Sequence, residues 1–506
     1  MPREVEIKFA ANAEGLAAAL ASPLLSGDES APGRQLTSIY FDTPGWDLQN
    51  SRMALRVRST DRGAPIMTLK WQPETTEGVF VRGEIEMPVA GLEPDLSLFD
   101  AAMTEKLRGL IGDNRLEAKY ETRVWRVARM VDQSGATIEA AFDEGVIRVG
   151  ERSRPLCEVE LELKSGEPRQ FYEFAALVAE QSPLVLDMVS KAERAFHFAV
   201  GTAPAPVKMR PVALPAEVIL DEALSQIILG CCSHFTANWA ALRDGDDPEA
   251  IHQMRVALRR LRAALAMFKQ AIPCAEFEVF RTEAKDLATA MGPARDCDAL
   301  RELIEIGPMA HFGEAKDFSM LLDALEARRR AAYTEARALL ASKRPTIFVL
   351  KLSAFVARRG WRNALGAEQL AILTEPVGIF GAQALDRLYK RVLKRGKNLA
   401  ALPDAARHQA RIALKNLRYG AEFFAGCFIE TRSASPFLRA TAQLQTVLGA
   451  HNDAASADQF LSGRHESEAA RAAGVVTGWY ARGAIIADER LARDWKDFRR
   501  IKPFWR

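Results

Sequence analysis

The amino-terminal stretch Glu4–Lys8 reads EVEIK, and a later stretch, Glu158–Lys164, reads EVELELK. In both, charged and apolar residues alternate with a period of two, which is typical of a β-strand. Alternate side chains on a strand share one face and lie about 6.5 Å apart. Each stretch therefore predicts a strand that carries two or three carboxylates and an ammonium group in one row.

Further strands with one charged face are predicted in the first 200 residues. Leu55–Arg58 and Val81–Met87 alternate in the same way, with arginines as well as glutamates on the charged face. Helical segments are predicted near residues 99–111 and 171–181. This half of the chain is therefore expected to have an α+β fold.

The charged rows allow two interpretations. A single strand with a charged face usually has that face in water. A closed sheet with its charged faces inward would instead form a lumen, in which carboxylates hold a hard cation and basic side chains hold phosphate oxygens. Composition does not decide between the two. The basic rows offer Arg56, Arg58, Lys70 and Arg82 as phosphate ligands.

Length and charge distribution favour a protein of two or more domains. The chain has 506 residues, whereas one domain typically has about 100–200. Residues 1–200 contain 23 Lys/Arg and 32 Asp/Glu, and residues 201–506 contain 45 and 34. An acidic half followed by a basic half suggests a cation site in the first and a polyanion partner in the second.

Several classes of protein find no support in the sequence. Charged residues lie near the start, where a signal peptide would have its apolar core. No apolar run reaches the length of about 18 residues that a membrane-spanning helix needs. The six cysteines form no C-x-x-C pair, which favours reduced thiols. Walker, dinucleotide, zincin and serine hydrolase motifs are absent from the sequence. We therefore expect a cytoplasmic protein with no membrane partner.

A proline-rich segment and an internal repeat organise the chain. Residues 201–216 hold four prolines and predict a linker between a first domain, 1–200, and a helical domain, 217–506. In the second domain, HQMRVALRRLR at 252–262 matches HQARIALKNLR at 408–418. A second pair of similar segments follows in the same order. We therefore expect two helical repeats, about 217–345 and 346–506, that form bundles facing each other.

Each repeat carries a stripe of positive charge on one helical face. The first stripe comprises His252, Arg255, Arg259 and Arg262, and the second comprises His408, Arg411, Lys415 and Arg418. No acidic residue lies between His252 and Phe268 or between His408 and Gly420. A face of one sign indicates a bound polyanion, although a merely solvated face remains the alternative. Because only Tyr419 could stack on a base, inorganic polyphosphate is favoured over nucleic acid.

The ordered motifs of residues 1–200 resemble those of the CYTH family. They are E-x-E-x-K at 4–8, YFDT at 40–43, ALRVR at 54–58, TLK at 68–70, R-x-E-x-E at 82–86, FD at 142–143, E-x-E-x-E at 158–162 and S-K-x-x-R at 190–194. The resemblance implies an eight-stranded antiparallel tunnel barrel that processes triphosphates with Mg²⁺ or Mn²⁺. Arg52 departs from the glycine of many members, which bears on the local turn.

The same resemblance implies roles for individual residues, with in-line attack by a metal-activated water as the mechanism. The implied metal ligands are Glu4, Glu6, Glu158, Glu160 and Glu162, with Glu86 as a further candidate. The implied phosphate ligands are Lys8, Arg56, Arg58, Lys70, Arg82, Arg123, Lys191 and Arg194. Glu4, Glu6, Lys8 and Lys70 are expected to be catalytic.

The second domain resembles the CHAD family, whose members look like polyphosphate-binding helical modules. The resemblance rests on the two H-Q-x-R helices, G-x-x-R-D at 292–296, G-x-x-N-D at 449–453, Trp495 and the closing PFW at 503–505. It adds Arg260 and Arg295 to the expected polyphosphate ligands. The second copy has Asn416 where the first has Arg260.

Together the resemblances imply an enzyme that hydrolyses inorganic triphosphate to pyrophosphate and phosphate, joined to a polyphosphate-binding domain. An adenylyl cyclase, or a triphosphatase for thiamine or nucleoside triphosphates, is an alternative on the same barrel. A non-catalytic polyphosphate tether is another, although intact carboxylate rows argue against it. Association with polyphosphate granules, the choice between Mg²⁺ and Mn²⁺ and the oligomeric state stay open.

Overall fold

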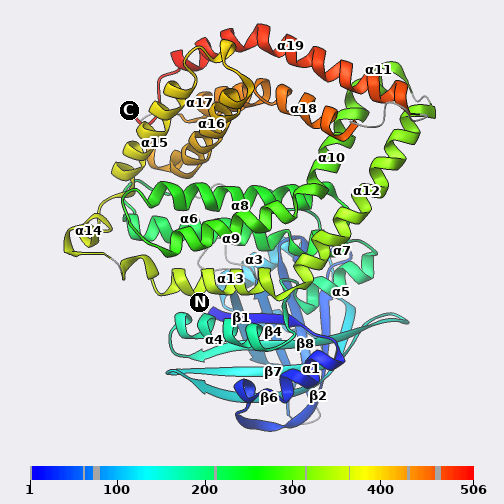
Figure 1. The fold of residues 1–506 in the computed structure, drawn as a ribbon. Helices are drawn as coiled ribbons and strands as arrows, with labels where there is room; N and C mark the ends of the chain where they lie inside the picture. The colour runs from blue at the N-terminus through cyan, green and yellow to red at the C-terminus, as the bar shows by residue number, and fades with distance from the viewer. Residues whose placement is uncertain are drawn as a thin grey trace. The chain divides into compact units, whose positions relative to one another are not determined.

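The computed structural model describes residues 3–60, 63–71, 80–209, 214–313, 316–363, 365–429, 433–461 and 469–506. The chain forms two compact units, each of which is built from several segments (Figure 1). The first contains residues 1–206, 236–247 and 339–360, and the second contains residues 207–235, 248–338 and 361–506.

The first unit is a closed antiparallel barrel of eight strands. The strands are β1 (Arg3–Ala10), β2 (Asp28–Asp42), β3 (Met53–Thr60), β4 (Ile66–Trp71), β5 (Val81–Pro88), β6 (Glu117–Gln133), β7 (Ala136–Val149) and β8 (Arg152–Ser165). They are hydrogen-bonded in the order β5-β4-β3-β2-β6-β7-β8-β1, and pairing of β1 with β5 closes the barrel. The short β9 (Val185–Leu186) adds to β1. The expected eight-stranded tunnel barrel is confirmed.

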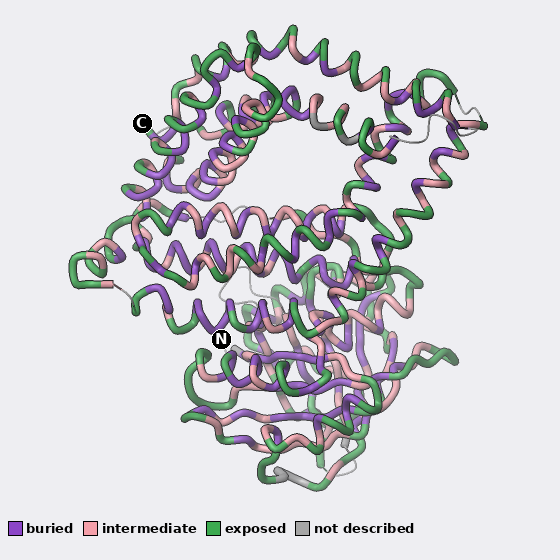
Figure 2. The backbone as a smooth tube through the Cα atoms, in the orientation of Figure 1, coloured by how far each residue is buried: buried purple, intermediate pink, exposed green. Residues whose placement is uncertain are grey.

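The register directs the charged rows to the inside of the barrel. Lys8 of β1 lies opposite Glu160 of β8, and Glu4 lies opposite Arg82 of β5. The alternate residues Ile7 and Phe9 have no exposed surface. Strand positions in Figure 2 are accordingly mostly buried or half-buried. Both faces of the sheet are therefore withdrawn from bulk water, which supports the lumen interpretation.

Four short helices cover the apolar outer face of the barrel: α1 (Ala13–Leu20), α2 (Asp47–Asn50), α3 (Ala101–Ile111) and α4 (Pro168–Gln181). Helix α5 (Lys191–Val200) instead packs against inward-facing residues such as Tyr40 and Val124. Leu107 of α3 packs with Leu55 and Leu69 in one core, on the side of β3 and β4 that faces away from the charges. The two helices predicted near 99–111 and 171–181 are thus present as α3 and α4.

The turn before β3 is made by Arg52, the residue that departs from the family pattern. Its φ of 57° lies in the left-handed region, which glycine adopts more easily than other residues. The turn therefore keeps the conformation that glycine favours, with arginine in its place.

Two helices from beyond the proline-rich segment belong to the barrel unit. Helix α13 (Lys343–Ala357) packs along α4, and Thr346 Oγ1 accepts a hydrogen bond of 3.0 Å from the backbone N–H of Leu186. Arg243 of α7 (Trp239–Asp244) donates to Asp187 at 3.2 Å. The compact units therefore interleave along the chain, whereas the proline-rich segment at 201–216 predicts a simple succession.

In its described residues the second unit is built of helices, with one isolated antiparallel bridge between Ile219 and Pro376. Its helices are α6 (Leu220–Ala237), α8 (Pro248–Phe268), α9 (Glu276–Ala290), α10 (Gly292–Ile304), α11 (Ala310–Phe312), α12 (Lys316–Ala341), α14 (Ala367–Ile372), α15 (Val377–Arg395), α16 (Asp404–Phe424), α17 (Ser435–Val447), α18 (Ala450–Leu461) and α19 (Ala470–Arg500). The matched segments form α8 and α16, each of 21 residues. Two further helices follow each of them, as the repeat predicts. Within the described residues, no helix is both long and apolar enough to span a membrane.

Candidate functional site

Three carboxylates meet inside the barrel. Asp143 of β7 and Glu158 of β8 are fully buried, and Glu160 is 7% exposed. One oxygen from each of the three lies within 4.8 Å of the others. Lys191, at the start of α5, contacts all three, with Nζ 2.8 Å from both Asp143 and Glu160. We call Asp143, Glu158 and Glu160 the acidic triad.

The environment separates the acidities of the triad. Burial raises the pKa of Glu158 to about 7, against the attraction of Lys191. Burial opposes ionisation of Glu160 as well, but Lys191 and Lys8 hold its pKa well below the usual value. For Asp143, Arg126 overcomes burial and lowers the pKa to about 2. At neutral pH the triad thus holds two firm negative charges and one carboxyl that can exchange a proton.

A second group of carboxylates lies on the neighbouring strands β1 and β5. Lys70 Nζ is 2.8 Å from Glu4 and 3.1 Å from Glu84. Lys8 Nζ is 3.1 Å from Glu6 and 2.8 Å from Glu160, so it joins this group to the acidic triad. Burial raises the pKa of Glu84 to about 7.

Arginines complete the inner surface of the barrel. Arg126 donates to Asp143 at 2.6–2.7 Å and to Glu160 at 2.5 Å. Arg58 donates to Ser38 at 3.2 Å, and burial together with Arg56 and Arg126 lowers its pKa to about 10. The lowered pKa means that Arg58 is short of nearby negative charge. An anion that entered the barrel would supply it.

Most residues predicted for this site are gathered in the barrel. The inward strand positions hold Glu4, Glu6, Lys8, Arg56, Arg58, Lys70, Arg82, Glu158 and Glu160, and Lys191 reaches the triad from α5. Glu86 also faces inward, where it accepts from Thr68 at 3.0 Å. Glu162 is more peripheral, since it binds Lys164 at 2.7 Å. Arg194 lies 3.7 Å from Glu158 and is also paired with Asp187.

Arg123 is not brought into this group. It is exposed and binds Glu121 at 3.0 Å, while its neighbours Thr122 and Val124 are buried on the inward face. The alternation along β6 therefore directs Arg123 outward and Arg126 inward.

The sequence interpretation missed Arg126, Asp143 and Glu84. The FD motif at 142–143 contains Asp143, and R-x-E-x-E contains Glu84, so the motifs themselves held a signal for both. Arg126 had no such signal, because its role follows from pairing directly opposite Asp143.

The buried carboxylates fit a divalent cation. Glu158 Oε2 and Glu6 Oε2 are buried and have no hydrogen-bond partner among the described residues. Arg194 approaches the first oxygen to 3.7 Å and Lys70 the second to 3.9 Å. A buried carboxylate oxygen without a hydrogen bond is costly unless a cation comes closer. The acidic triad offers oxygen ligands of the kind that Mg²⁺ and Mn²⁺ prefer.

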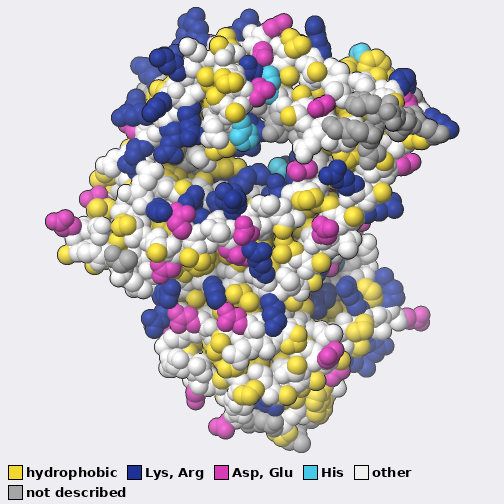
Figure 3. Space-filling model, in the orientation of Figure 1, with side chains coloured by type: hydrophobic (Ala, Val, Ile, Leu, Met, Phe, Trp, Pro, Cys, Tyr) yellow, Lys and Arg dark blue, Asp and Glu magenta, His cyan; other side chains and the backbone are white. Residues whose placement is uncertain are grey.

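In the helical unit, cations from the two repeats converge. Arg259 of α8 donates to the hydroxyl of Tyr419 on α16 at 3.4 Å. Burial, with Arg411, Arg259 and Arg255 nearby, lowers the pKa of Lys415 to about 8. In Figure 3 the helical unit is hollowed, and lysine and arginine side chains border the hollow. We call Arg255, Arg259, Arg411 and Lys415 the cationic face.

Gly292 explains part of the G-x-x-R-D motif. Arg255 donates to the carbonyl of Ala288, and a Cβ built at Gly292 would lie 3.0 Å from Arg255 Nη1. A side chain at position 292 would crowd the Arg255 guanidinium, so the glycine of the motif favours this placement of an arginine of the cationic face.

Other predicted polyphosphate ligands have different surroundings. Arg260 is 6% exposed and forms an ion pair with Glu422, which also accepts from Arg418 at 2.8 Å. These two arginines are therefore partly neutralised by an acid just beyond the stripe. Arg295 donates to His252 at 3.1 Å, and His408 is exposed. For Arg262, burial and the nearby Arg281 lower the pKa, as expected in a region rich in positive charge.

Comparisons with known proteins agree with this geometry. Residues 2–196 match the model of the CYTH domain, and residues 226–462 match that of the CHAD domain. The chain is a CYTH–CHAD protein. Both resemblances seen in the sequence are therefore confirmed.

Relatives of this CYTH–CHAD protein match most of the chain or a part of it. An uncharacterised protein of Mycobacterium tuberculosis is 25% identical over 485 residues, which cover 89% of this chain and 86% of that protein. The inorganic triphosphatase of Haemophilus influenzae is 29% identical over 166 residues, 32% of this chain and 45% of that protein. The crystal structure of the CHAD domain from Ricinus communis is 30% identical, with a TM-score of 0.50, and the match covers 59% of this chain and 98% of that one.

Proposed function

We propose that the barrel hydrolyses inorganic triphosphate to pyrophosphate and phosphate, with Mg²⁺ or Mn²⁺ as cofactor, and that the cationic face of the CHAD domain binds polyphosphate. One observation supports the proposed hydrolysis of triphosphate most directly. The interior of a closed barrel holds carboxylates for a metal ion together with basic side chains for a phosphate chain. The partial similarity to an inorganic triphosphatase supports the same substrate class.

The basic side chains of the barrel would hold the substrate. Arg56 and Arg58 on β3, with Lys70 on β4, would contact non-bridging oxygens of the triphosphate. Phosphoryl transfer is catalysed mainly by positioning and by stabilising charge on these oxygens. Arg56 Nε is buried and without a hydrogen-bond partner among the described residues, which leaves it available to an incoming anion.

The carboxylates would hold the metal and accept the proton. Glu4, Glu6 and the acidic triad are the candidate ligands, and a bound divalent ion supplies Lewis-acid stabilisation of phosphoryl oxygens. Water attacks the terminal phosphorus in line, and pyrophosphate leaves. Burial raises the pKa of Glu84, which is not among these ligands, to about 7, so its carboxyl can take up the proton that the water releases.

The cationic face would bind a phosphate chain through charge. Arg255, Arg259, Arg411 and Lys415 come from two helices and have no acidic side chain bonded to them in the described residues. A chain of phosphates has no bases to stack, so it needs only such a row of cations.

A substrate panel tests the proposal. Tripolyphosphate, thiamine triphosphate, ATP and long-chain polyphosphate are each incubated with the full chain and Mg²⁺ or Mn²⁺, and the products are separated. We expect the highest kcat/KM for tripolyphosphate, with pyrophosphate and phosphate as products. Cyclic AMP from ATP, or a clear preference for thiamine triphosphate, would overturn the substrate assignment.

A further inference from the structure

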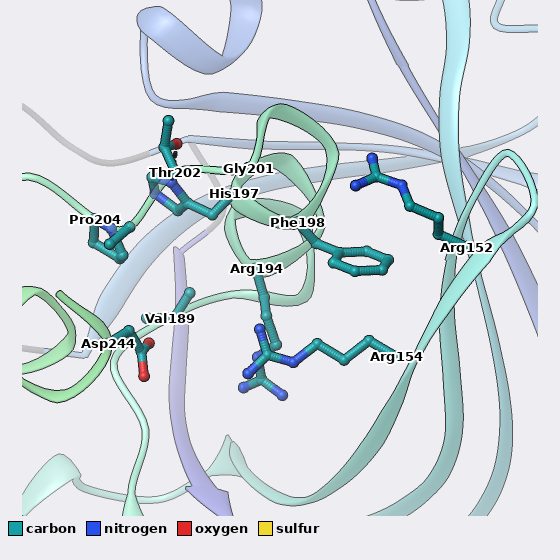
Figure 4. A pocket seen from close by; sticks show the side chains of 11 residues that line it. Arg152, Arg154, Val189, Arg194, His197, Phe198, Gly201, Thr202, Pro204 and Asp244 are labelled. Atoms are coloured by element: carbon teal, nitrogen blue, oxygen red, sulfur yellow. Dashed lines mark hydrogen bonds between the residues drawn. The ribbon is translucent and has the colours of Figure 1, made fainter.

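A cavity of about 500 Å³ lies in the barrel unit, where the start of β8 meets α5 (Figure 4). Its wall includes Arg152 and Arg154 of β8, Arg194 and Phe198 of α5, and Asp244 of α7. Neither the CYTH motifs nor the proposed reaction gives Arg152 and Arg154 a role. Arg152 and Arg154 are exposed, and with Arg194 they offer an oxyanion in this cavity guanidinium groups from two elements.

The acid in the wall does not neutralise these arginines. Both oxygens of Asp244 accept from Arg243, at 2.7 and 2.8 Å. Arg152 packs over the ring of Phe198, 5.1 Å from its centroid, and donates to the carbonyl of Ala199 at 3.0 Å. Arg154 has no ion pair or hydrogen bond within the described parts of the chain. In Figure 4 its side chain extends toward that of Arg194.

Arg194 connects this cavity with the acidic triad. It lines the cavity, forms an ion pair with the buried Asp187 and lies 3.7 Å from Glu158. Asp187 in turn accepts from Arg243 at 3.2 Å. A charge placed in the cavity therefore acts on an arginine that also contacts the interior of the barrel.

We propose that this cavity binds a phosphate-type oxyanion, either inorganic phosphate or pyrophosphate, through Arg152 and Arg154, and that the bound anion draws Arg194 away from Glu158. The guanidinium fork suits phosphate oxygens, and the volume is within the range of small-molecule sites. Binding at this site is independent of the proposed function. Its effect on turnover rests on that function, because both anions are products of the proposed reaction.

Binding is tested by calorimetry with pyrophosphate, and separately with phosphate, in EDTA. The full chain carries Arg56→Gln and Arg58→Gln, which weaken the barrel interior, and Arg255→Gln and Arg259→Gln, which weaken the cationic face. In this background we expect one remaining site for at least one of the two anions. Adding Arg152→Gln and Arg154→Gln should weaken that site at least tenfold. The control Arg148→Gln removes another surface arginine of the barrel, one that pairs with Glu121 at 3.3 Å, and should leave the site unchanged.

Each result decides the proposal. Absence of binding in the background, or equal loss in the control and the cavity variants, would overturn it. Should the background fail to fold by circular dichroism, the wild-type chain and the two cavity variants are compared, and the variants should lose one class of sites.

A separate turnover assay tests whether the bound anion acts on catalysis. Loss of non-competitive inhibition by pyrophosphate in the cavity variants supports the coupling, whereas retention contradicts it. Absence of any turnover would count against the proposed function and leave the binding result intact.

Discussion

At the scale of single residues, Glu160 balances more cations than any other carboxylate described in the barrel interior. Lys8, Lys191 and Arg126 all contact it, at 2.5–2.8 Å. Removing one partner of a buried ion pair costs about 3–5 kcal/mol, since the remaining charge is left unpaired. Glu160→Gln should therefore lower the free energy of unfolding by about that amount, measured by urea denaturation.

A phosphate chain should offset part of this loss. With tripolyphosphate and EDTA present, the difference between Glu160→Gln and wild type should shrink, because the substrate would supply the missing negative charge. An equal difference with and without tripolyphosphate would show that the three cations do not face the substrate.

Arg126 and Arg123 form a matched pair for a second prediction. Arg126 contacts the acidic triad, whereas Arg123 is exposed beside Glu121. Arg126→Gln should reduce kcat/KM for tripolyphosphate by about 10²–10³, the size expected when a buried charge-stabilising donor is lost. Arg123→Gln should change it less than about twofold, in line with other surface substitutions. Equal effects would contradict the register of β6.

Sequence patterns predicted the inward residues well where a strand alternates regularly. The rows at 4–8 and 158–162 needed only the period of two, and the closed sheet then directed them inward. Arg123 and Arg126 differ, because they lie three residues apart and alternation assigns them to opposite faces. Choosing between them requires the pairing partner on β7, which no local pattern supplies.

At the scale of elements, helices α8 and α16 present the cationic face, and its pH dependence follows from Lys415. Burial and neighbouring cations lower the pKa of Lys415 to about 8, so in the free protein it is charged at pH 7 and mostly neutral at pH 9. Polyphosphate binds the charged form and should raise this pKa. Affinity should thus fall about three- to tenfold between pH 7 and pH 9, as one lost charge implies.

The control for the predicted pH dependence of polyphosphate binding is the Lys415→Arg variant, whose guanidinium stays charged between pH 7 and pH 9. Binding followed by fluorescence anisotropy should then be nearly independent of pH between 7 and 9. A decline in Lys415→Arg equal to that of wild type would assign the pH dependence to another group.

The repeat itself was predictable, but the surroundings of its arginines were not. The matched segments start at equivalent residues and form helices of equal length. Glu422, however, lies just past the second stripe and binds Arg260 from the other repeat. A contact between residues 162 positions apart depends on how the helices pack, so it could not be inferred from either helix separately.

At the scale of the whole molecule, the barrel unit depends on two helices that come later in the chain. Helix α13 covers α4, and α7 supplies Arg243 to Asp187. A fragment ending at residue 206 would expose the apolar surface that α13 covers. It should melt at a lower temperature than the barrel in the full chain, or aggregate, as followed by scanning calorimetry and light scattering.

The same fragment carrying both Asp187→Asn and Arg194→Gln tests whether its instability comes from loss of α13 or from loss of Arg243, the partner of Asp187. The two substitutions together leave the net charge unchanged. If loss of α13 dominates, the fragment should be unstable with or without these substitutions. A fragment as stable as the full-length barrel would contradict the assignment of α7 and α13 to the barrel unit. Composition and prolines predicted two domains, but only the fold reveals that segments of the second half complete the first unit.

The central claim is that the inward carboxylates make the barrel a metal-dependent triphosphatase. Phosphate release from tripolyphosphate by wild type, Glu4→Gln and Glu6→Gln, each with Mg²⁺ and with EDTA, tests it most directly, with circular dichroism as a check on folding. We predict turnover by wild type with Mg²⁺, none with EDTA, and at least a hundredfold loss in both folded variants, while polyphosphate binding persists. Unchanged turnover in both variants, or turnover that survives EDTA, would contradict the claim.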